Sequence, residues 1–561
     1  MFKNKLLHNL FHVIYLIIFS TAVAAEETGP PAAGSWVAIL PPLLTIAFAL
    51  AWKRVIPALF LGVLLGAWAI NDFGLAGLWL GLLDTFQVYV LKALADPDHA
   101  AIILFSLMVG GMVGIISRNG GMQGIVNHVV KWADTARHAC LATASLGIAI
   151  FFDDYANTLV VGNTMRPVTD SMRISRAKLA YLVDSTAAPV ACIALVTTWI
   201  GYEVGLIGDA ISKLPDLDAE AYLVFLNTIP YSFYPLMAIA FVFMISASGR
   251  DFGPMLKAEN RARQHGVSQV ETVAGSNSDC EGIEPIPGKP QRAINAFIPV
   301  LVMIFGVMAG LYFTGKSALE GIDQPALRDI IGNSDSYKAL MWASLLSMLS
   351  AALLTLGQRI MDLEEVVNAW YQGVRSMLYA LIILVLAWSL GEITTVLGTA
   401  DFLVTVLGDS LPSFSLPVIV FVLAAATAFA TGTSWGAMGI LLPLAIPLTW
   451  AVMQSHGHTG PEHMHLLYSS IAAVLAGSVW GDHCSPISDT TILSSLASGC
   501  DHIEHVRTQL PYAMVVGATS LLAGSLLTAL GSPWWVGLLL GIGILALVVK
   551  LFGKHPGEAR T

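Results

Sequence analysis

Charged residues are scarce in this sequence. Of its 561 residues only 12% are Asp, Glu, Lys or Arg, whereas 56% are hydrophobic. A soluble globular domain has about 25% charged residues, so this chain has too little polar surface to cover a protein of its size in water. A basic stripe of the kind that binds nucleic acid is also missing, and the net charge of −10 is spread over the segments between apolar runs.

Cysteine is rare as well, and its spacing excludes a zinc or disulfide framework. The chain has five cysteines and no C-x-x-C pair, and most of them lie in or beside apolar segments. We interpret them as small core residues; they are Cys140, Cys192, Cys280, Cys484 and Cys500.

Long hydrophobic runs recur along the whole chain, and each is near the roughly 20 residues that a helix needs to cross a hydrocarbon core about 30 Å thick. These runs predict an all-α, polytopic membrane protein. The predicted spans are 36–52, 55–71, 74–95, 99–117, 138–152, 178–200, 222–247, 293–314, 338–356, 377–397, 414–431, 435–454, 466–480, 508–530 and 533–551.

The first 25 residues have the layout of a secretory signal. Lys3 and Lys5 precede the apolar run 11–19, and small residues follow at 21–25. Residues 1–25 are therefore a cleavable signal-like segment or an uncleaved first membrane helix. In both cases the residues after Glu26 face the outside, which fits a bacterial inner (cytoplasmic) membrane.

The distribution of Lys and Arg predicts the topology. The only extended polar stretch, 250–292, is rich in both, so we place it in the cytoplasm as a loop between two membrane repeats, 30–249 and 293–552. Basic residues also place the tail 553–561 in the cytoplasm. The acidic stretch 203–220 is expected to form a loop outside.

The two halves of the chain contain similar pairs of polar breaks. In the first half they lie at 151–157 and 183–189, and in the second half at 430–436 and 481–486. In each half the second break ends in proline. Paired interrupted segments in matching positions indicate the binding site of a secondary transporter. We therefore predict two inverted repeats that contain broken helices or re-entrant hairpins.

Five aspartates lie in or beside these breaks: Asp153, Asp154, Asp184, Asp482 and Asp489. A charge at the bilayer centre costs at least about 2.5–3.5 kcal/mol on insertion scales, so embedded carboxylates need a compensating function. Carboxylates, neutral side-chain oxygens and unwound carbonyls are the ligands that sodium uses in such transporters. Because desolvation disfavours a charged carboxyl, the same group can also hold a proton.

Neutral polar side chains accompany the aspartates and complete the predicted cation and proton site. Those expected to bind are Asn157, Ser485, Ser488 and Thr490; a second tier, expected to line the substrate cavity, is Thr433, Ser434 and His483. A bound sodium ion would be the transported or coupling ion, and no other metal and no cofactor is expected.

Structural roles remain open for several of these residues. Asp153 could cap the helix that follows it, and Ser488 or Asp489 could cap the next. Asp184 could pair with an arginine, and His483 could be a structural histidine or a proton relay.

The segments 431–443 and 481–493 resemble the signature stretches of the NhaC-type sodium/proton antiporter family, and 152–157 fits the same family. The resemblance covers roughly residues 35–550. It implies a secondary active transporter that exchanges sodium for protons by alternating access, with no catalytic residue and no enzymatic activity. Its expected partners are sodium, protons and the lipid bilayer; the sequence leaves a homodimer open.

The family implies sodium more firmly than the second solute. Some relatives carry malate and lactate or amino acids, so the alternative is a sodium-coupled carrier of an amino acid or small carboxylate. The absence of a cationic side chain within the breaks favours a cation. Arg166, next to the first break, weakens that argument because it could bind a carboxylate.

Overall fold

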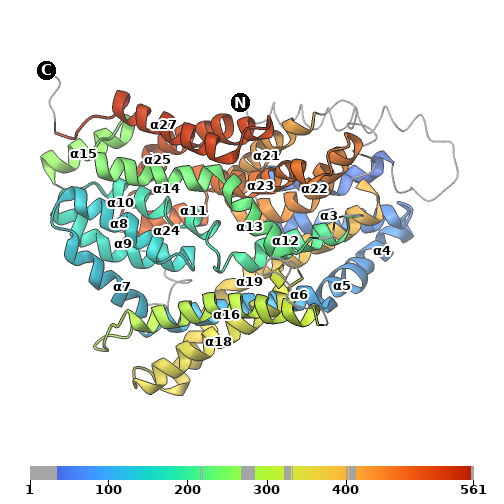
Figure 1. Ribbon diagram of the computed structural model, residues 1–561, viewed down its shortest axis with the longest axis horizontal. Helices are drawn as coiled ribbons and strands as arrows, with labels where there is room; N and C mark the ends of the chain where they lie inside the picture. Colours follow the sequence, from blue (N-terminus) through green and yellow to red (C-terminus); the bar gives the residue numbers. More distant parts are fainter. Residues whose placement is uncertain are drawn as a thin grey trace.

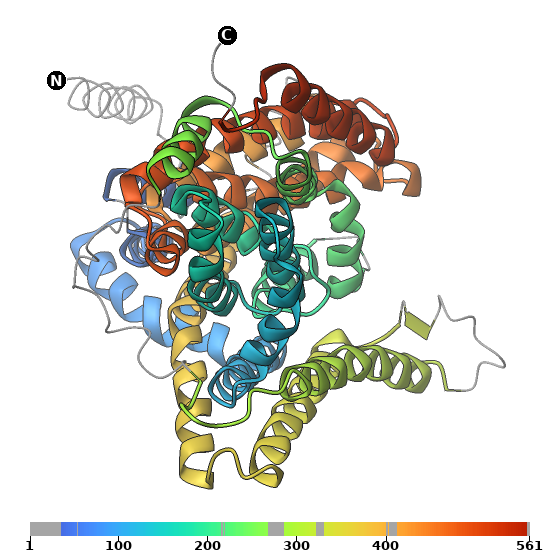
Figure 2. The ribbon, with the colours of Figure 1, turned by 90° about the vertical axis from the view of Figure 1, so that its left-hand side faces the viewer.

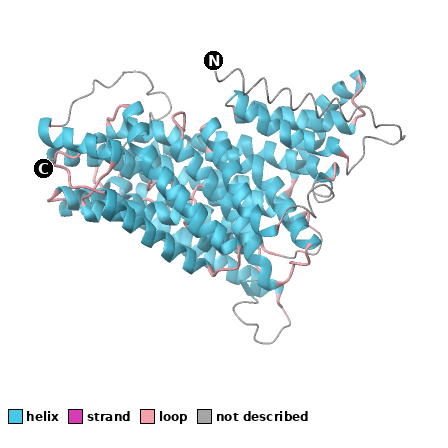
Figure 3. Cartoon of the chain, turned by 90° about the horizontal axis from the view of Figure 1, so that it is seen from above, coloured by secondary structure: helices cyan, strands magenta, loops and turns pink. Residues whose placement is uncertain are grey.

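The computed structural model describes residues 35–557 except 53, 215–216, 218, 267–284, 321–329, 332, 400–401 and 403–411. The regular structure of the described residues is helical (Figure 3), apart from one isolated bridge between Asp251 and Lys554. The signal-like segment 1–25 lies outside the described residues. The prediction of an all-α fold is confirmed.

Ten helical segments of the described chain are long and apolar enough to cross a membrane. They are Leu75–Ala95 (α4, η2 and α5), Pro97–Arg118 (α6), Ile294–Ala318 (α16), Ser336–Gly357 (α18), Leu363–Val396 (α19), Ser413–Thr431 (η5 and α21), Ser434–Ser455 (α22), Pro461–Cys484 (η6 and α23), His502–Ala529 (α25, η7 and α26) and Trp534–Phe552 (α27).

The remaining principal helices are shorter or bent. They are α2 (Leu40–Trp52), α3 (Val55–Ile70), α7 (Gly121–Val129), α8 (Ala136–Ala149), α9 (Asp154–Ser171), α10 (Arg176–Asp184), α11 (Ala188–Ala191), α12 (Ile200–Ser212), α13 (Ala221–Thr228), α14 (Phe233–Ser248), α15 (Gly253–His265) and α24 (Asp489–Ser498). The segments Ala221–Tyr231 and Phe233–Ser248 are together long and apolar enough to cross a membrane and are bent by 49° at the break between them, as in a broken span or a re-entrant loop.

Large apolar side chains cover much of the outer surface. Phe305 on α16, Leu353 on α18 and Leu551 on α27 are all more than half exposed. Exposed apolar area of this extent would be an aggregation hazard in water, but it is what a hydrocarbon environment requires. Together with the ten apolar segments, it shows a multi-pass membrane protein.

Small residues allow α6 and α19 to cross closely. On α6, Gly110 and Gly114 meet Gly373 of α19, and a Cβ atom at Gly373 would lie 2.0 Å from the Gly110 carbonyl oxygen. Such close backbone approach is typical of helix packing in membranes, where dispersion contacts replace the hydrophobic effect. The α16–α18 hairpin packs on the other side of α6 and lies at one side of the molecule (Figures 1 and 2).

The break predicted at 183–189 is confirmed, and it divides the apolar stretch 178–200: α10 ends at Asp184, and α12 begins at Ile200. One sequence-based expectation about secondary structure is wrong. The external loop expected at 203–220 begins as a buried helix, because residues 203–212 belong to α12. The polar stretch 250–292 also contains a helix, α15, which packs against α10 and α25.

A buried ionic cluster joins the start of α10 to the C-terminal segment, and we call it the C-terminal clasp. Lys178 Nζ donates to Asp251 Oδ2 at 2.7 Å, and the Tyr512 hydroxyl donates to Asp251 Oδ1 at 2.8 Å. The backbone of Asp251 pairs with Lys554 through two hydrogen bonds of 2.9 and 3.0 Å. The clasp therefore fixes the N-terminal end of α10.

Candidate functional site

The first half places its polar residues at the tip of a helical hairpin. Helices α8 and α9 pack side by side and are joined by residues 150–153. Asn157 Nδ2 donates to the carbonyl oxygens of Gly147 (2.6 Å), Ile150 (3.1 Å) and Thr186 (3.1 Å). One amide group thus holds the hairpin tip against the break that follows α10.

The second half contains two corresponding breaks. Helix α21 (Leu416–Thr431) ends at Gly432, whose φ of 74° is readily available only to glycine, and Thr433 caps α22 through the backbone N–H of Gly436. Helix α23 (Met464–Cys484) ends one residue before Ser485, whose hydroxyl donates to the Phe429 carbonyl at 2.7 Å. The two breaks of this half therefore lie against each other.

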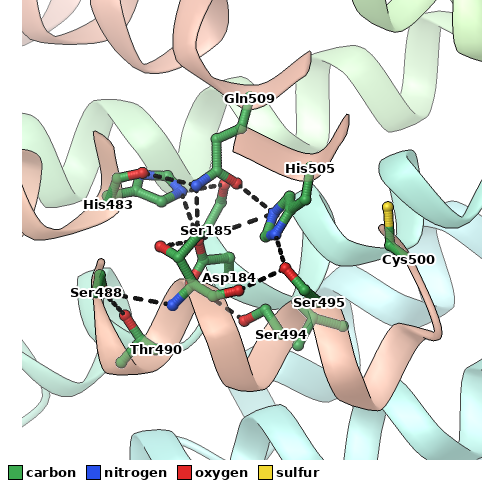
Figure 4. Close-up of polar contacts among 12 residues, drawn as sticks. Asp184, Ser185, His483, Ser488, Thr490, Ser494, Ser495, Cys500, His505 and Gln509 are labelled. Atoms are coloured by element: carbon green, nitrogen blue, oxygen red, sulfur yellow. Dashed lines mark hydrogen bonds and ion pairs between the residues drawn. The ribbon is translucent and has the colours of Figure 1, made fainter. Parts of the chain in front are cut away.

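Asp184, the last residue of α10, connects the two halves. It accepts hydrogen bonds from Thr491 (3.1 Å) and Ser494 (3.2 Å) on α24, and from Gln509 Nε2 (2.6 Å) on α25 (Figure 4). Among the described residues, these three are the hydrogen-bond donors to Asp184. None of them is the arginine that the sequence left open as its partner. Asp184 is a fully engaged acceptor in this conformation.

His483 lies beside this group at the end of α23. Its Nε2 is 3.0 Å from the Ser185 hydroxyl, and its Nδ1 is 2.6 Å from the Tyr234 hydroxyl. Gln509 Nε2 also donates to the His483 carbonyl oxygen at 2.6 Å. Because both ring nitrogens have hydroxyl partners, the structural role considered for His483 fits its contacts; the proton-relay role stays a prediction.

A second buried histidine, His505, extends the network along α25 (His502–Thr519). Its Nδ1 is 2.8 Å from the Ser495 hydroxyl, its Nε2 is 2.9 Å from Gln509 Oε1, and the same Nε2 lies 4.0 Å from Asp184 Oδ2 (Figure 4). Ser495 also contacts His502, which is partly exposed. Polar contacts therefore run from the surface to Asp184.

Asp482, on the last turn of α23, is only partly satisfied. Its Oδ2 accepts a hydrogen bond from Thr490 Oγ1 at 3.1 Å, and Thr490 lies 2.9 Å from the Ser488 hydroxyl. Its Oδ1 is buried and has no hydrogen-bond donor among the described residues. Ser488 itself caps α24 through the N–H of Thr491, as considered from the sequence.

The adjacent aspartates of the first half differ sharply. Asp153 Oδ1 accepts from the Ala156 N–H at 2.7 Å and caps α9, so the capping role is confirmed. Asp154 is 2% exposed, and neither of its carboxyl oxygens has a donor in the described structure. The Asn157 Oδ1 and Thr158 Oγ1 atoms are buried and lack partners in the same way.

Aspartates from both halves lie within electrostatic range of Tyr155 on α9. This side chain interacts electrostatically with Asp489, Asp154 and Asp482, and α24 packs directly on α9 and α10. The structure thus brings together acidic residues that lie more than 300 positions apart in the sequence. Asp489 also interacts with other residues of the protein, so it is not a free carboxylate.

Two of the second-tier residues, Thr433 and Ser434, form the start of α22. Thr433 is the cap of α22, and Ser434 is buried in its first turn. Arg166 lies close to Gly499, at the C-terminal end of α24, and therefore away from Asp489 at the start of that helix. Binding of a carboxylate by Arg166 stays a prediction.

Sequence reasoning missed four residues that the structure places in or near the site. Gln509, His505 and Ser494 belong to the Asp184 network, and Glu203 is a completely buried acid in α12. The signal for Gln509 and His505 was available, because two polar residues four positions apart on an apolar helix share one face. The five cysteines fit the prediction of core residues where described: Cys140, Cys192 and Cys484 are buried, Cys500 is half-buried, and Cys280 lies outside the described residues.

Comparisons with known proteins agree with this architecture. A family model described as "Na+/H+ antiporter family" matches residues 190–528. An uncharacterised protein of Haemophilus influenzae is 32% identical over 515 residues, which cover 91% of this chain and 92% of that protein. An arginine/ornithine antiporter, ArcD of Halobacterium salinarum, is 34% identical over 115 residues, only 19% of this chain and 21% of ArcD.

Two solved transporters share the fold. The YdaH transporter of Alcanivorax borkumensis matches with a TM-score of 0.52 and 15% identity, covering 91% of this chain and 98% of YdaH. MtrF of Neisseria gonorrhoeae, which is described within a class of antimetabolite efflux pumps, matches with a TM-score of 0.51 and 14% identity over 86% of this chain and 87% of MtrF. At these identities the likeness shows the fold alone.

A multi-pass bundle with broken helices that meet at buried carboxylates fits a secondary transporter, and the matching family model is one of antiporters. The chain belongs to the Na+/H+ antiporter family.

Proposed function

We propose that this protein exchanges sodium for protons by alternating access, and that both ions compete for Asp154 and Asp482. The observation that supports this assignment is the set of carboxyl oxygens without donors: both oxygens of Asp154 and Oδ1 of Asp482. They are buried and come from opposite halves of the chain, and α9, which begins at Asp154, packs directly on α24, which follows the break after Asp482.

The physical argument starts from the cost of leaving these oxygens unpaired. An ionised carboxylate inside a protein costs several kcal/mol unless a counter-charge or hydrogen bonds compensate it. A proton removes the charge, and a sodium ion balances it. Because the two cannot occupy the same oxygens together, binding of one favours release of the other, and this competition couples opposite fluxes.

Neutral oxygens around the two aspartates would complete the coordination of the ion. Asn157 Oδ1 and Thr158 Oγ1 are buried and lack donors, so they can serve as ligands; Thr490 already contacts Asp482. The other predicted site residues hold this geometry: Asp153 and Ser488 cap helices, Asp184 joins α10 to α24 and α25, and Ser485 fixes the second break.

Alternating access fits the position of the site between two broken segments. The breaks after α10 and α23 meet there, and we propose that they belong to inverted repeats whose relative movement exposes the site to either side. We further propose a bacterial inner-membrane location with the segment 250–292 and the C-terminus in the cytoplasm.

Reconstitution tests the proposal. Purified protein in vesicles is given a sodium pulse while a dye reports lumenal pH, and the assay is repeated with labelled arginine, malate and lactate. Proton movement driven by sodium alone supports antiport. Sodium-dependent uptake of an organic solute without proton flux would instead establish the alternative carrier function.

Matched substitutions locate the site in the same assay. Asp154→Asn and Asp482→Asn should each abolish exchange. Asp134→Asn makes the same chemical change at an exposed position and should leave exchange unaltered. Full activity in both buried variants would remove the proposed site.

A further inference from the structure

A buried acid outside the aspartate site has no counter-charge. Glu203, in the first turn of α12, is 0% exposed, and neither of its carboxyl oxygens accepts a hydrogen bond from a described residue. The thiol of Cys192 lies beside the carboxyl and is its electrostatic neighbour. A thiol is only a weak donor, so it cannot replace the hydration that an ionised carboxylate loses on burial.

Asp209, the other acid of α12, differs from Glu203 because it is ion-paired. Asp209 lies 3.0 Å from Lys213 Nζ and 3.5 Å from His99 Nε2. Among the described residues, Lys213 and His99 are the basic residues that ion-pair with an acid of α12. Both of them pair with Asp209. Glu203, six residues earlier, has no such partner among the described residues. Its surroundings therefore accommodate the neutral carboxylic acid and not the charged carboxylate.

Glu203 is connected to the proposed ion site through Trp199, which precedes it by about one helical turn. Trp199, four residues earlier, faces Asp154, although its indole N–H is outside hydrogen-bonding geometry, and its ring centroid is 5.2 Å from that of Trp435 in α22. The Tyr202 hydroxyl donates to the Trp435 carbonyl at 2.5 Å. The first turn of α12 is therefore part of the packing between the site and the second half.

From these contacts we infer that Glu203 is a second proton-binding site, which carries a proton in addition to the ions exchanged at Asp154 and Asp482. The inference rests on the proposed function. In the closed conformation the carboxyl is shielded and neutral. When α12 separates from its neighbours, water reaches the carboxyl, stabilises the carboxylate and allows the proton to leave.

Infrared spectroscopy tests the protonation state without transport. Wild-type protein at neutral pH and saturating sodium, which displaces the protons from Asp154 and Asp482, should still show a carbonyl band from a neutral, buried carboxylic acid, and Glu203→Gln should remove that band. Asp209→Asn is the matched control on the same helix and should leave the band in place, because Asp209 is ion-paired. A band that persists in Glu203→Gln overturns the inference.

The proton-to-sodium ratio tests the function of the group. It is measured in vesicles from the membrane potential at which net exchange stops. Glu203→Gln should lower the ratio by one proton per cycle while sodium is still exchanged. An unchanged ratio in a transporting variant overturns the inference.

An inactive variant is also informative. If Glu203→Gln loses the band and all transport but is still stabilised by sodium against thermal unfolding, the cation site is intact and the proton role is supported. If it also loses that stabilisation, Glu203 is a structural residue and the inference fails. Absence of sodium-driven pH change in the wild type would refute the proposed function instead, and the infrared result would stand apart from it.

Discussion

Asparagine substitutions at Asp154 and Asp184 should separate ion binding from structural support. Asp154 accepts no hydrogen bond from the described residues. Asparagine keeps the shape of the side chain, removes no existing bond and abolishes a buried charge. The free energy of unfolding of Asp154→Asn should therefore equal or slightly exceed that of the wild type, while exchange is lost.

Asp184→Asn should have the opposite profile. Thr491 and Gln509 donate to one carboxylate oxygen and Ser494 to the other. Loss of the charge weakens two of these bonds from charge-assisted to neutral, about 1 kcal/mol each, and the third donor meets an amide N–H₂ group, about 1 kcal/mol more. The free energy of unfolding should fall by roughly 3 kcal/mol.

Thermal unfolding with and without sodium measures both effects. A ligand at about 100 times its Kd stabilises the folded state by about 2.7 kcal/mol. Wild type should show this sodium-dependent stabilisation, and Asp154→Asn should not. The reasoning is refuted if Asp154→Asn retains the sodium response, or if it is destabilised as strongly as Asp184→Asn.

Three further predictions concern the cap of α24, the C-terminal clasp and Glu259. Ser488→Ala removes the cap of α24 and should lower the free energy of unfolding by about 1 kcal/mol, whereas Ser488→Thr should largely retain it, as thermal unfolding would show. Lys178→Met leaves Asp251 buried without its cation and should cost about 3–5 kcal/mol; part of this should return in the double variant with Asp251→Asn, measured by the same method. Burial raises the pKa of Glu259 in α15 above its ordinary value of 4.5, against the opposing effect of Lys178, so the folded state holds this proton more tightly than the unfolded state. Its contribution to stability is therefore present below pH 4.5 and is lost as the pH rises through the folded value, and the difference in unfolding free energy between wild type and Glu259→Gln should change with pH in that direction.

Much of the fold could be predicted because the membrane imposes a simple rule on the sequence. A run of apolar residues such as 294–318 has to be a helix, since no water is available for its backbone groups. The same rule located the polar breaks, because Asp154 and Asp482 interrupt such runs and need a reason to be there. Hydropathy therefore predicted the spans and indicated which buried acids to consider for a site.

The division of labour among the aspartates could not be predicted in this way. Asp184 and Asp154 have equally apolar flanks, yet one accepts three hydrogen bonds and the other none. That difference depends on contacts with α24 and α25, which lie more than 300 residues away in the sequence. Glu203 was misplaced because the acids around it suggested a solvated loop, whereas Asp209 is ion-paired and Glu203 is buried.

The C-terminal clasp has a consequence for biosynthesis. Lys178 is made early, but the strand-like pairing that completes its surroundings needs Lys554, which follows every membrane helix described. Because chains fold progressively from the N-terminus as the ribosome advances, α10 must wait in the membrane without its final anchor while more than 300 residues are inserted. A chain truncated before Lys554 would leave the backbone groups of Asp251 without this pairing, so the last residues synthesised complete the surroundings of one of the earlier helices.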